Sequence, residues 1–310
     1  MEIIKIRNLS KRFRDLTAVN RINLKIRKGE IFGLLGPNGA GKTTTLSILA
    51  TLMSPTSGTA IVDGHDVSEN PSKVRDSIGI VFQESVIDSD LTAYDNLDFH
   101  ARIYKIPKEL KERRIKEVIE LVNLSDCLKK PVEQFSGGMK RRLEIARGLL
   151  HHPRILFLDE PTLGLDPQTR RHIWDYITDL KKKERITIVL TTHYMDEADV
   201  LCDRVAIIDK GMIIALGKPE QLKNRLGGDI IKIKMNRANG NIMKILKRLK
   251  AKKFEVLGNE ISIVTKNAES KIARILDTIK RYDHSKIESV SIHKPTLEDV
   301  FLYFTGREMR

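Results

Sequence analysis

The sequence predicts an α/β protein in which helices cover both faces of a parallel sheet, followed by a smaller α+β domain. Over residues 1–219, short runs of continuous apolar residues alternate with helical segments, which is typical of strands buried on both faces of a parallel sheet. A glycine-rich loop, 36–41, separates one such run from a helix, as in the first unit of such folds. In residues 220–310 the order becomes strand, helix, two strands, helix and strand, a split-βαβ arrangement.

The composition favours a folded protein of the reducing cytosol. The chain has 310 residues, of which 41% are hydrophobic and 31% charged, about two ordinary domains. No apolar run approaches the roughly 18 residues of a membrane helix, since the best candidate, 205–216, is interrupted by Asp209 and Lys210. The first residues lack a signal-peptide pattern, and Cys127 and Cys202 match no metal or redox spacing.

The expected elements of the first domain follow apolar periodicity and proline positions. The expected strands are 2–9, 18–26, 30–35, 77–82, 155–158 and 186–191. The expected helices are 43–53, 97–105, 109–123, 139–151 and 168–180. Proline limits two of them, because Pro107 separates 97–105 from 109–123 and Pro153 ends 139–151. We therefore expect a helical subdomain at about 90–150 and an antiparallel β subdomain at the amino terminus.

The second domain is expected to contain four strands, two covering helices and a short final helix. The strands are 230–235, 254–257, 261–265 and 286–293, and the helices are 241–252, 268–282 and 297–304. The final helix carries an apolar stripe that we expect to dock on a surface, formed by Leu297, Val300, Phe301 and Phe304. Residues 220–310 contribute +9 of the net charge of +14. Such a charge suits nucleic acid or an anionic membrane, but these lysines alternate with core-type residues, which favours a solvated surface.

A phosphate-loop motif follows the strand 30–35. It consists of Gly36, Pro37, Asn38, Gly39, Ala40, Gly41, Lys42 and Thr43. Glycines let the backbone N–H groups converge on phosphate oxygens, and the helix that follows adds its positive dipole end. Lys42 is placed to reach the β- and γ-phosphates, and the Thr43 hydroxyl to ligate Mg²⁺.

An acidic pair ends the apolar strand 155–158. Alone, Asp159 and Glu160 could equally cap a helix. With a phosphate loop in the same sheet, however, the carboxyl end of this strand is where a ligand binds. We therefore expect Asp159 to hold a metal ion through water, and Glu160 to orient and deprotonate an attacking water molecule.

A Ser-Gly-Gly segment precedes the helix 139–151. Ser136, Gly137 and Gly138 lie before a basic helix start, which could cap the helix and also bind phosphate. As a lone motif it favours a plain helix cap. We call these three residues the signature segment.

Taken in this order, the motifs resemble those of the ATP-binding cassette (ABC) ATPase family over about residues 1–219. The resemblance implies that Phe13 stacks on adenine and that Thr44 also contacts nucleotide. It implies that Gln83 lies at the junction with a transmembrane subunit and touches the metal. Asp166 would lie in the loop that crosses to a partner subunit, and His193 would contact the γ-phosphate. Met139 stands where the commonest signature has glutamine, and Phe13 where tyrosine is common; stacking needs only the ring.

The carboxyl-terminal residues narrow the resemblance. Pro295-Thr296-Leu297-Glu298-Asp299-Val300-Phe301 is similar to the ending of ATP-binding subunits in the daunorubicin and multidrug-resistance exporter branch. The resemblance implies a Mg²⁺-dependent ATPase that forms a head-to-tail homodimer with two ATP molecules between the subunits. It also implies a separate integral-membrane permease that contacts the transported small molecule, and a location at the cytoplasmic face of the membrane.

Two alternatives belong to other classes. A soluble ABC ATPase acting on nucleic acid or the ribosome would suit the net charge of +14. Against it, the sequence has no long coiled-coil insertion, no zinc-type cysteines and no second cassette, so we expect no nucleic acid. A nucleotide-binding regulator without turnover is disfavoured, because Glu160 and His193 are both present.

Overall fold

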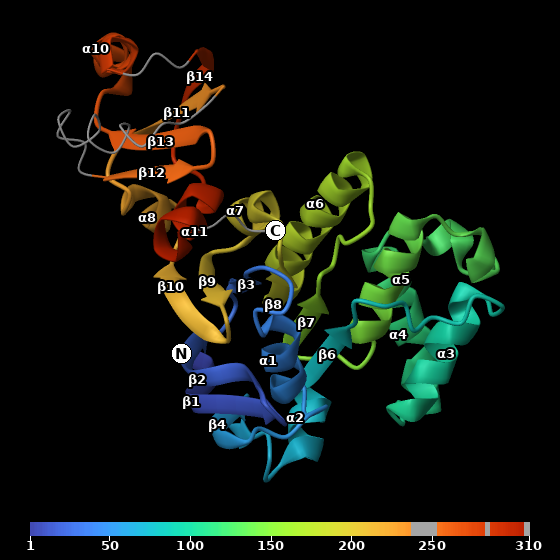
Figure 1. Ribbon diagram of the computed structural model, residues 1–310. Helices are drawn as coiled ribbons and strands as arrows, with labels where there is room; N and C mark the ends of the chain where they lie inside the picture. The colour runs from blue at the N-terminus through green and yellow to red at the C-terminus, as the bar shows by residue number, and fades with distance from the viewer. Residues whose placement is uncertain (237–252, 283–285, 307–310) are drawn as a thin grey trace. The chain divides into compact units, whose positions relative to one another are not determined.

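The computed structural model describes residues 1–236, 253–282 and 286–306. The chain divides into two units, Met1–Leu216 and Gly217–Arg310, and each is described by itself (Figure 1). The division falls just before Pro219, where the sequence pattern changes. No helix among the described residues combines the length and the apolar character needed to cross a bilayer.

The first unit opens with an antiparallel sheet. Its strands are β1 (Glu2–Phe13), β2 (Leu16–Arg27), β4 (Ser57–Val62) and β5 (His65–Asp66), in the order β2-β1-β4-β5. β1 runs beyond the expected 2–9, because its second half pairs with β2 until Phe13 lies opposite Leu16. Register shifts along this pair break the simple alternation of apolar residues from which the expected boundary was drawn.

A six-stranded sheet forms the centre of this unit. The order is β10-β9-β3-β8-β7-β6, and β6, β7, β8, β3 and β9 pair in parallel. The strands are β3 (Ile31–Leu35), β6 (Ile78–Val81), β7 (Ile155–Asp159), β8 (Thr187–Thr192), β9 (Arg204–Asp209) and β10 (Met212–Gly217). The predicted parallel sheet is confirmed, and its parallel strands bring their carboxyl ends to one edge.

Helices cover this sheet. They are α1 (Lys42–Leu49), α2 (Pro71–Ser77), α6 (Pro167–Glu184) and α7 (Met195–Leu201). One apolar cluster joins α1 to both sheets, with Leu46 of α1, Ile4 of β1 and Phe157 of β7 all buried in it. α1 ends before the expected Met53, because Thr51 has a φ of 61°, which a continuing helix does not allow.

The expected helical subdomain lies between β6 and β7 (Figure 1). It contains α3 (Ala93–Ile103), α4 (Lys108–Leu121) and α5 (Gly137–Leu149), with short 3₁₀ turns at Ser125–Cys127 and Val132–Gln134. α3 begins earlier than expected, because Thr92 and Asp95 cap it reciprocally.

Several short elements were not expected from the sequence. They are β4, β5, α2, α7, β9, β10 and α8 (Pro219–Asn224). The run 205–216, which is too short and too interrupted by charge to cross a membrane, has another place in the fold. It forms parts of β9 and β10, because Lys210 and Gly211 both have positive φ angles and turn the chain between them.

The second unit contains the sheet β12-β13-β11-β14, antiparallel throughout. Its elements are β11 (Asp229–Met235), β12 (Lys253–Leu257), β13 (Glu260–Thr265), α10 (Ala268–Tyr282), β14 (Ile287–His293) and α11 (Leu297–Thr305). Ile275 and Ile279 of α10 pack on Ile233 and Ile263 of one sheet face. This confirms the predicted α+β class; the expected helix 241–252 lies outside the described residues.

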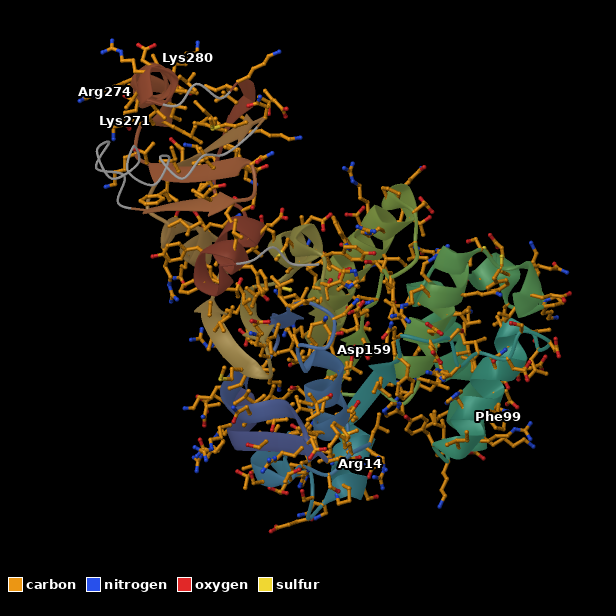
Figure 2. The ribbon with its side chains drawn as sticks, in the orientation of Figure 1. Arg14, Phe99, Asp159, Lys271, Arg274 and Lys280 are labelled. Carbon is orange, nitrogen blue, oxygen red and sulfur yellow. The ribbon has the colours of Figure 1, made fainter. Side chains whose placement is uncertain are left out.

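The opposite face of α10 carries basic side chains. Lys271, Arg274 and Lys280 are exposed, and Figure 2 shows them directed away from the sheet. The lysine-rich sequence of this unit therefore supplies surface charge around a small apolar core, as the alternation of lysines with core-type residues predicted.

The final helix, α11, buries only part of the apolar stripe expected from the sequence. Leu297, Val300 and Phe301 are buried, and α11 contacts α8 of the same unit. Phe304 is exposed instead, with its ring edge-on to Tyr303 at a centroid distance of 5.4 Å. Leu302 is buried although it lay outside the expected stripe.

Two phenylalanines of α11 make a matched test of this packing. Phe301 is 1% exposed and Phe304 is 41% exposed. Phe301→Ala should lower the free energy of unfolding of the second unit by about 3–5 kcal/mol, because it empties a buried site. Phe304→Ala should cost less than about 1 kcal/mol. Urea unfolding of the full chain measures both, and equal losses would contradict the burial of α11 described above.

Candidate active site

The phosphate loop connects β3, whose five residues are all buried, to α1. Two of its glycines are required by close approaches. A Cβ on Gly36 would lie 2.2 Å from the carbonyl oxygen of Ile208, and one on Gly41 would lie 2.3 Å from that of Ala18. Gly41 also has a φ of 101°, which strains any other residue. The loop therefore has one backbone path, fixed between β2 and β9.

This path leaves donors free at the start of α1. Within the described residues, the N–H groups of Gly39, Gly41, Lys42, Thr43 and Thr44 donate to no acceptor. The first N–H groups of a helix have no intrahelical partner and carry a partial positive charge. Pro37, Asn38 and Ala40 complete the loop, and Asn38 and Gly39 are exposed. The loop can thus receive phosphate oxygens, as the sequence predicts.

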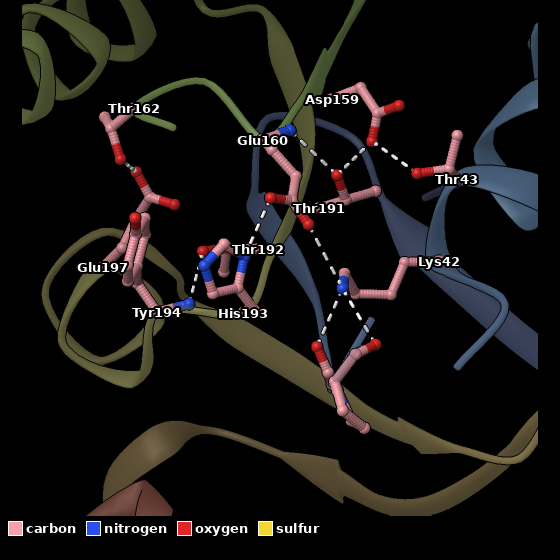
Figure 3. A network of polar contacts seen from close by, with 12 residues as sticks. Lys42, Thr43, Asp159, Glu160, Thr162, Thr191, Thr192, His193, Tyr194 and Glu197 are labelled. Atoms are coloured by element: carbon pink, nitrogen blue, oxygen red, sulfur yellow. Dashed lines mark hydrogen bonds and ion pairs between the residues drawn. The ribbon is translucent and has the colours of Figure 1, made fainter. Parts of the chain in front are cut away.

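Lys42 lies buried inside the loop, with 4% of the residue exposed. Its Nζ donates to the carbonyl oxygens of Gly36 at 2.8 Å and Pro37 at 3.1 Å, and it is 3.2 Å from a carboxylate oxygen of Glu160 (Figure 3). Burial lowers the pKa of Lys42, and the carboxylates of Glu160 and Asp159 oppose that shift. The ammonium group is therefore held by Glu160 where a phosphate would also attract it.

Asp159 ends β7 beside the start of α1. The Thr43 hydroxyl donates to its carboxylate at 3.1 Å, and the Thr191 hydroxyl donates to the same oxygen (Figure 3). β7 and β8 are neighbours in parallel, with Asp159 opposite Thr191. The two oxygen-bearing side chains expected to bind metal, Thr43 and Asp159, are therefore adjacent.

Glu160 lies between a cation and a histidine. It is 6% exposed, and its N–H donates to the Thr191 hydroxyl at 2.9 Å. One carboxylate oxygen faces Lys42, and the other is 2.8 Å from Nδ1 of His193. Glu160 has a φ of 45°, a strained conformation for this residue type. The strain aims a buried carboxylate at the phosphate loop, an arrangement suited to activating water beside a bound phosphate.

The signature segment and Asp166 lie together, away from these contacts. Ser136 caps α5 by accepting from the N–H of Met139 at 3.3 Å. A Cβ on Gly137 would meet Leu165 at 3.2 Å, and one on Gly138 would meet Thr169 at 2.6 Å. Within the described residues, no hydrogen bond or ion pair joins this segment to the phosphate loop.

Asp166 caps α6 through three hydrogen bonds. It accepts from the N–H groups of Gln168 and Thr169 and from the Thr169 hydroxyl. The bond from the Thr169 hydroxyl is the main cause of a lowered pKa of Asp166. Asp166 is also exposed, so part of its carboxylate faces solvent beside the signature segment.

Phe13 and Gln83, which the resemblance places at the nucleotide and the metal, are both exposed. Phe13 ends β1 and is 40% exposed, with Lys11 Nζ 5.2 Å from the centre of its ring. The hairpin that carries Phe13 passes next to Gly41 at Ala18. Gln83 follows β6 and is exposed; within the described chain, no hydrogen bond joins it to Thr43 or Asp159.

Arg141 is a residue whose role the sequence did not indicate. It is buried, and its guanidinium donates to the backbone carbonyl oxygens of Phe82, Asp159, Glu160 and Pro161 and to the carboxylate of Glu144. It thereby ties α5 to the ends of β6 and β7. The sequence marks Arg141 only as one of three consecutive basic residues, so nothing local distinguishes it from its neighbours.

Adjacent arginines of α5 test this tie. Arg141→Lys keeps the charge but loses the planar fork, leaving several buried carbonyl groups unpaired. We expect it to lower the free energy of unfolding by about 3 kcal/mol. Arg142, whose Nη1 bonds the carbonyl oxygens of Val122 and Asn123, is partly exposed, so Arg142→Lys should cost less than about 1 kcal/mol. Urea unfolding of both variants measures the difference, and a stable Arg141→Lys protein would refute the assignment.

Two family models match this chain. The model described as ABC transporter matches residues 19–163, and the model of the C-terminal domain of DrrA1-3-like ATP-binding proteins matches residues 217–305. Together they confirm the resemblance found in the motifs and in the carboxyl-terminal residues. Neither supports the alternative of a soluble ATPase acting on nucleic acid or the ribosome.

Individual proteins give the same result. The linearmycin resistance ATP-binding protein of Bacillus subtilis is 38% identical, over 99% of this chain and 100% of its own length. The doxorubicin resistance ATP-binding protein DrrA of Mycobacterium tuberculosis is 38% identical, over 94% of this chain and 89% of its own. An ATP-binding cassette solved as a dimer in a post-hydrolysis state with ADP and Pi is 28% identical, covers 69% of this chain and 98% of that chain, and has a TM-score of 0.62. The chain therefore belongs to the ABC transporter family, as an ATP-hydrolysing subunit of its drug-resistance branch.

Proposed function

We propose that this chain powers the export of a small molecule through a separate membrane permease, by closing a dimer around ATP and reopening it after hydrolysis. One observation supports this most directly. The buried carboxylate of Glu160 lies between Lys42 of the phosphate loop and His193, which equips one chain with a phosphate cradle and a base for water. The resistance named in both relatives supports export as the direction of transport.

The proposed hydrolysis begins with the release of Glu160. When the phosphates of ATP enter the loop, they offer Lys42 a stronger anionic partner than one carboxylate, because they carry several negative charges. Glu160, freed from Lys42, orients and deprotonates the attacking water. His193 would contact the γ-phosphate. Catalysis then rests on positioning and on charge stabilisation, as expected for phosphoryl transfer.

Mg²⁺ fits the same edge of the sheet. Thr43 and Asp159 present two hard oxygen ligands 3.1 Å apart, and Mg²⁺ uses few protein ligands when substrate phosphates supply the rest. Among the described residues, no group of three His, Cys, Asp or Glu could hold a metal alone, which agrees with a metal that arrives with nucleotide. When bound, it would neutralise phosphate charge. Gln83 would join this shell only by moving toward Thr43 and Asp159.

Each ATP is proposed to be shared by two chains. Among the described residues, no hydrogen bond joins the signature segment to its own phosphate loop, and Ser136 and Asp166 are both exposed. Pairing two chains head to tail would place Ser136 of one against the γ-phosphate held by Lys42 of the other. Phe13 would stack on adenine at the rim. The dimeric form of the solved relative supports this arrangement.

The two parts of the chain are proposed to divide the work. Residues 1–219 would bind and hydrolyse ATP, because all the motifs lie there. Residues 220–310 would act as an accessory domain that regulates closure. The permease would bind the chain at the cytoplasmic face of the membrane and would alone contact the cargo, since the relatives are named as ATP-binding proteins and not as complete transporters.

The role of Glu160 has a direct test. Glu160→Gln keeps the shape but removes the base, so ATP should still bind while hydrolysis falls by about 10²-fold or more. Glu120→Gln, at an exposed carboxylate of α4, is the control and should hydrolyse ATP normally. Steady-state ATPase assays and equilibrium ATP binding measure both effects. Wild-type turnover by pure Glu160→Gln protein would remove Glu160 from the catalytic role.

Mixing two inactive variants tests the shared site. Lys42→Ala damages the phosphate half, and Ser136→Arg damages the signature half. A mixed dimer then has one doubly damaged site and one intact site, so activity should return on mixing, to at most about half of the wild-type level for each mixed dimer. If mixed dimers form without any regained activity, the two halves do not act across chains in this way.

A further inference from the structure

Glu197 is a buried carboxyl group with no role in the hydrolysis proposed above. It lies on α7, four residues after His193, and is 0% exposed. A buried carboxyl group is costly unless it is hydrogen-bonded. Its hydrogen-bond partners therefore indicate what the group is for.

Two donors from other elements bind the same oxygen of Glu197. The Thr162 hydroxyl donates at 2.7 Å and Trp174 Nε1 donates at 3.0 Å. Thr162 follows Glu160 by two residues, and Trp174 lies on α6, the helix that Asp166 caps. Figure 3 shows Glu197 pointing at Thr162 from the segment that carries His193 and Tyr194. The carboxyl group of Glu197 thus joins the segment that contains His193 to residues on both sides of Asp166, Thr162 before it and Trp174 after it.

A second contact joins the same two segments. The guanidinium of Arg170, on the first turn of α6, lies 3.9 Å from the centre of the Tyr194 ring and 3.9 Å from the carboxylate of Asp196. The Arg170 N–H donates to the carbonyl oxygen of Asp166 at 2.9 Å. The rings of Tyr194 and His193 are themselves 4.1 Å apart. A displacement of Asp166 would therefore move Arg170 and, through it, the Tyr194 ring that contacts His193.

The bonds at Glu197 require an acceptor and not a negative charge. Burial raises the pKa of Glu197, against the hydrogen bonds from Thr162 and Trp174 and the nearby charge of Arg170. Both donors need only an acceptor oxygen, which a carboxyl group offers whether or not it is ionised. The contact can thus hold the two segments together through hydrogen bonds to one oxygen.

We propose that Glu197 is a positioning residue that makes His193 and Asp166 move as one body, so that a partner chain docking at Asp166 sets the histidine of the neighbouring site. This rests on the proposed function, which places His193 at the γ-phosphate and Asp166 at the partner chain. The phosphate loop and Lys42 lie outside this connection. Breaking it should therefore change turnover and leave ATP binding intact.

A pair of matched threonines tests the proposal. Thr162→Val removes the hydroxyl that bonds Glu197. Thr187→Val is the control. Thr187 is as buried as Thr162, and its hydroxyl accepts a hydrogen bond from the Gly29 N–H. It lies at the start of β8, whereas His193 follows the end of that strand. In the full-length chain, Thr162→Val should lower kcat about tenfold, the scale of one hydrogen bond lost at a buried partner, with KM for ATP within about twofold. Thr187→Val should keep both.

Substitution of Glu197 itself separates acceptor from charge. Glu197→Gln keeps the carbonyl oxygen and should retain kcat within about threefold, whereas Glu197→Leu should lose about tenfold or more. If Glu197→Leu does not fold, the threonine pair decides alone. The proposal is overturned if Thr162→Val keeps wild-type kcat, loses no more than Thr187→Val at equal thermal stability, or loses affinity for ATP instead of turnover. A wild-type chain that binds but never hydrolyses ATP would instead refute the proposed function.

Discussion

The buried ion pair between Lys42 and Glu160 is the interaction on which the rest of the site depends. Both residues are less than a tenth exposed, and removing one partner of a buried pair costs far more than removing a surface charge. The pair exists because β3 and β7 lie on either side of β8 in parallel. Their carboxyl ends therefore deliver the phosphate loop and the acidic residues to one edge. His193, which follows β8 between them, completes the group.

Much of this site could be predicted from the sequence, because its chemistry is carried by local motifs. A glycine loop between an apolar strand and a helix has few other uses, and the Asp-Glu pair gains its meaning from that loop. Arg141 and Glu197 could not be predicted. Their partners lie between 18 and 59 residues away for Arg141, apart from Glu144 on its own helix, and 23 and 35 residues away for Glu197. No local pattern encodes such contacts. The short elements were missed for a related reason, since strands such as β4 alternate too weakly to be recognised alone.

The residues of the phosphate loop and its acidic partners lie apart from the residues proposed to complete the site of a second chain. Lys42, Asp159, Glu160 and His193 are connected within one chain, whereas Ser136 and Asp166 cap the starts of α5 and α6 on a surface of their own. Helix starts offer free N–H groups to an anion, which is why we propose that the signature segment binds a phosphate held by the partner chain. The contacts of Glu197 and Arg170 join that surface back to His193. ATP binding and turnover would then depend on different parts of the chain. Such a division suits an ATPase subunit whose turnover depends on a partner chain.

ATP is proposed to assemble each site from two chains. Sedimentation equilibrium of full-length Glu160→Gln protein tests it directly, because this variant should bind ATP without consuming it. We expect a dimer in saturating ATP and Mg²⁺ and a monomer without nucleotide, with Ser136→Arg in the same background remaining monomeric. A Glu160→Gln chain that binds ATP stoichiometrically and stays monomeric would contradict the account.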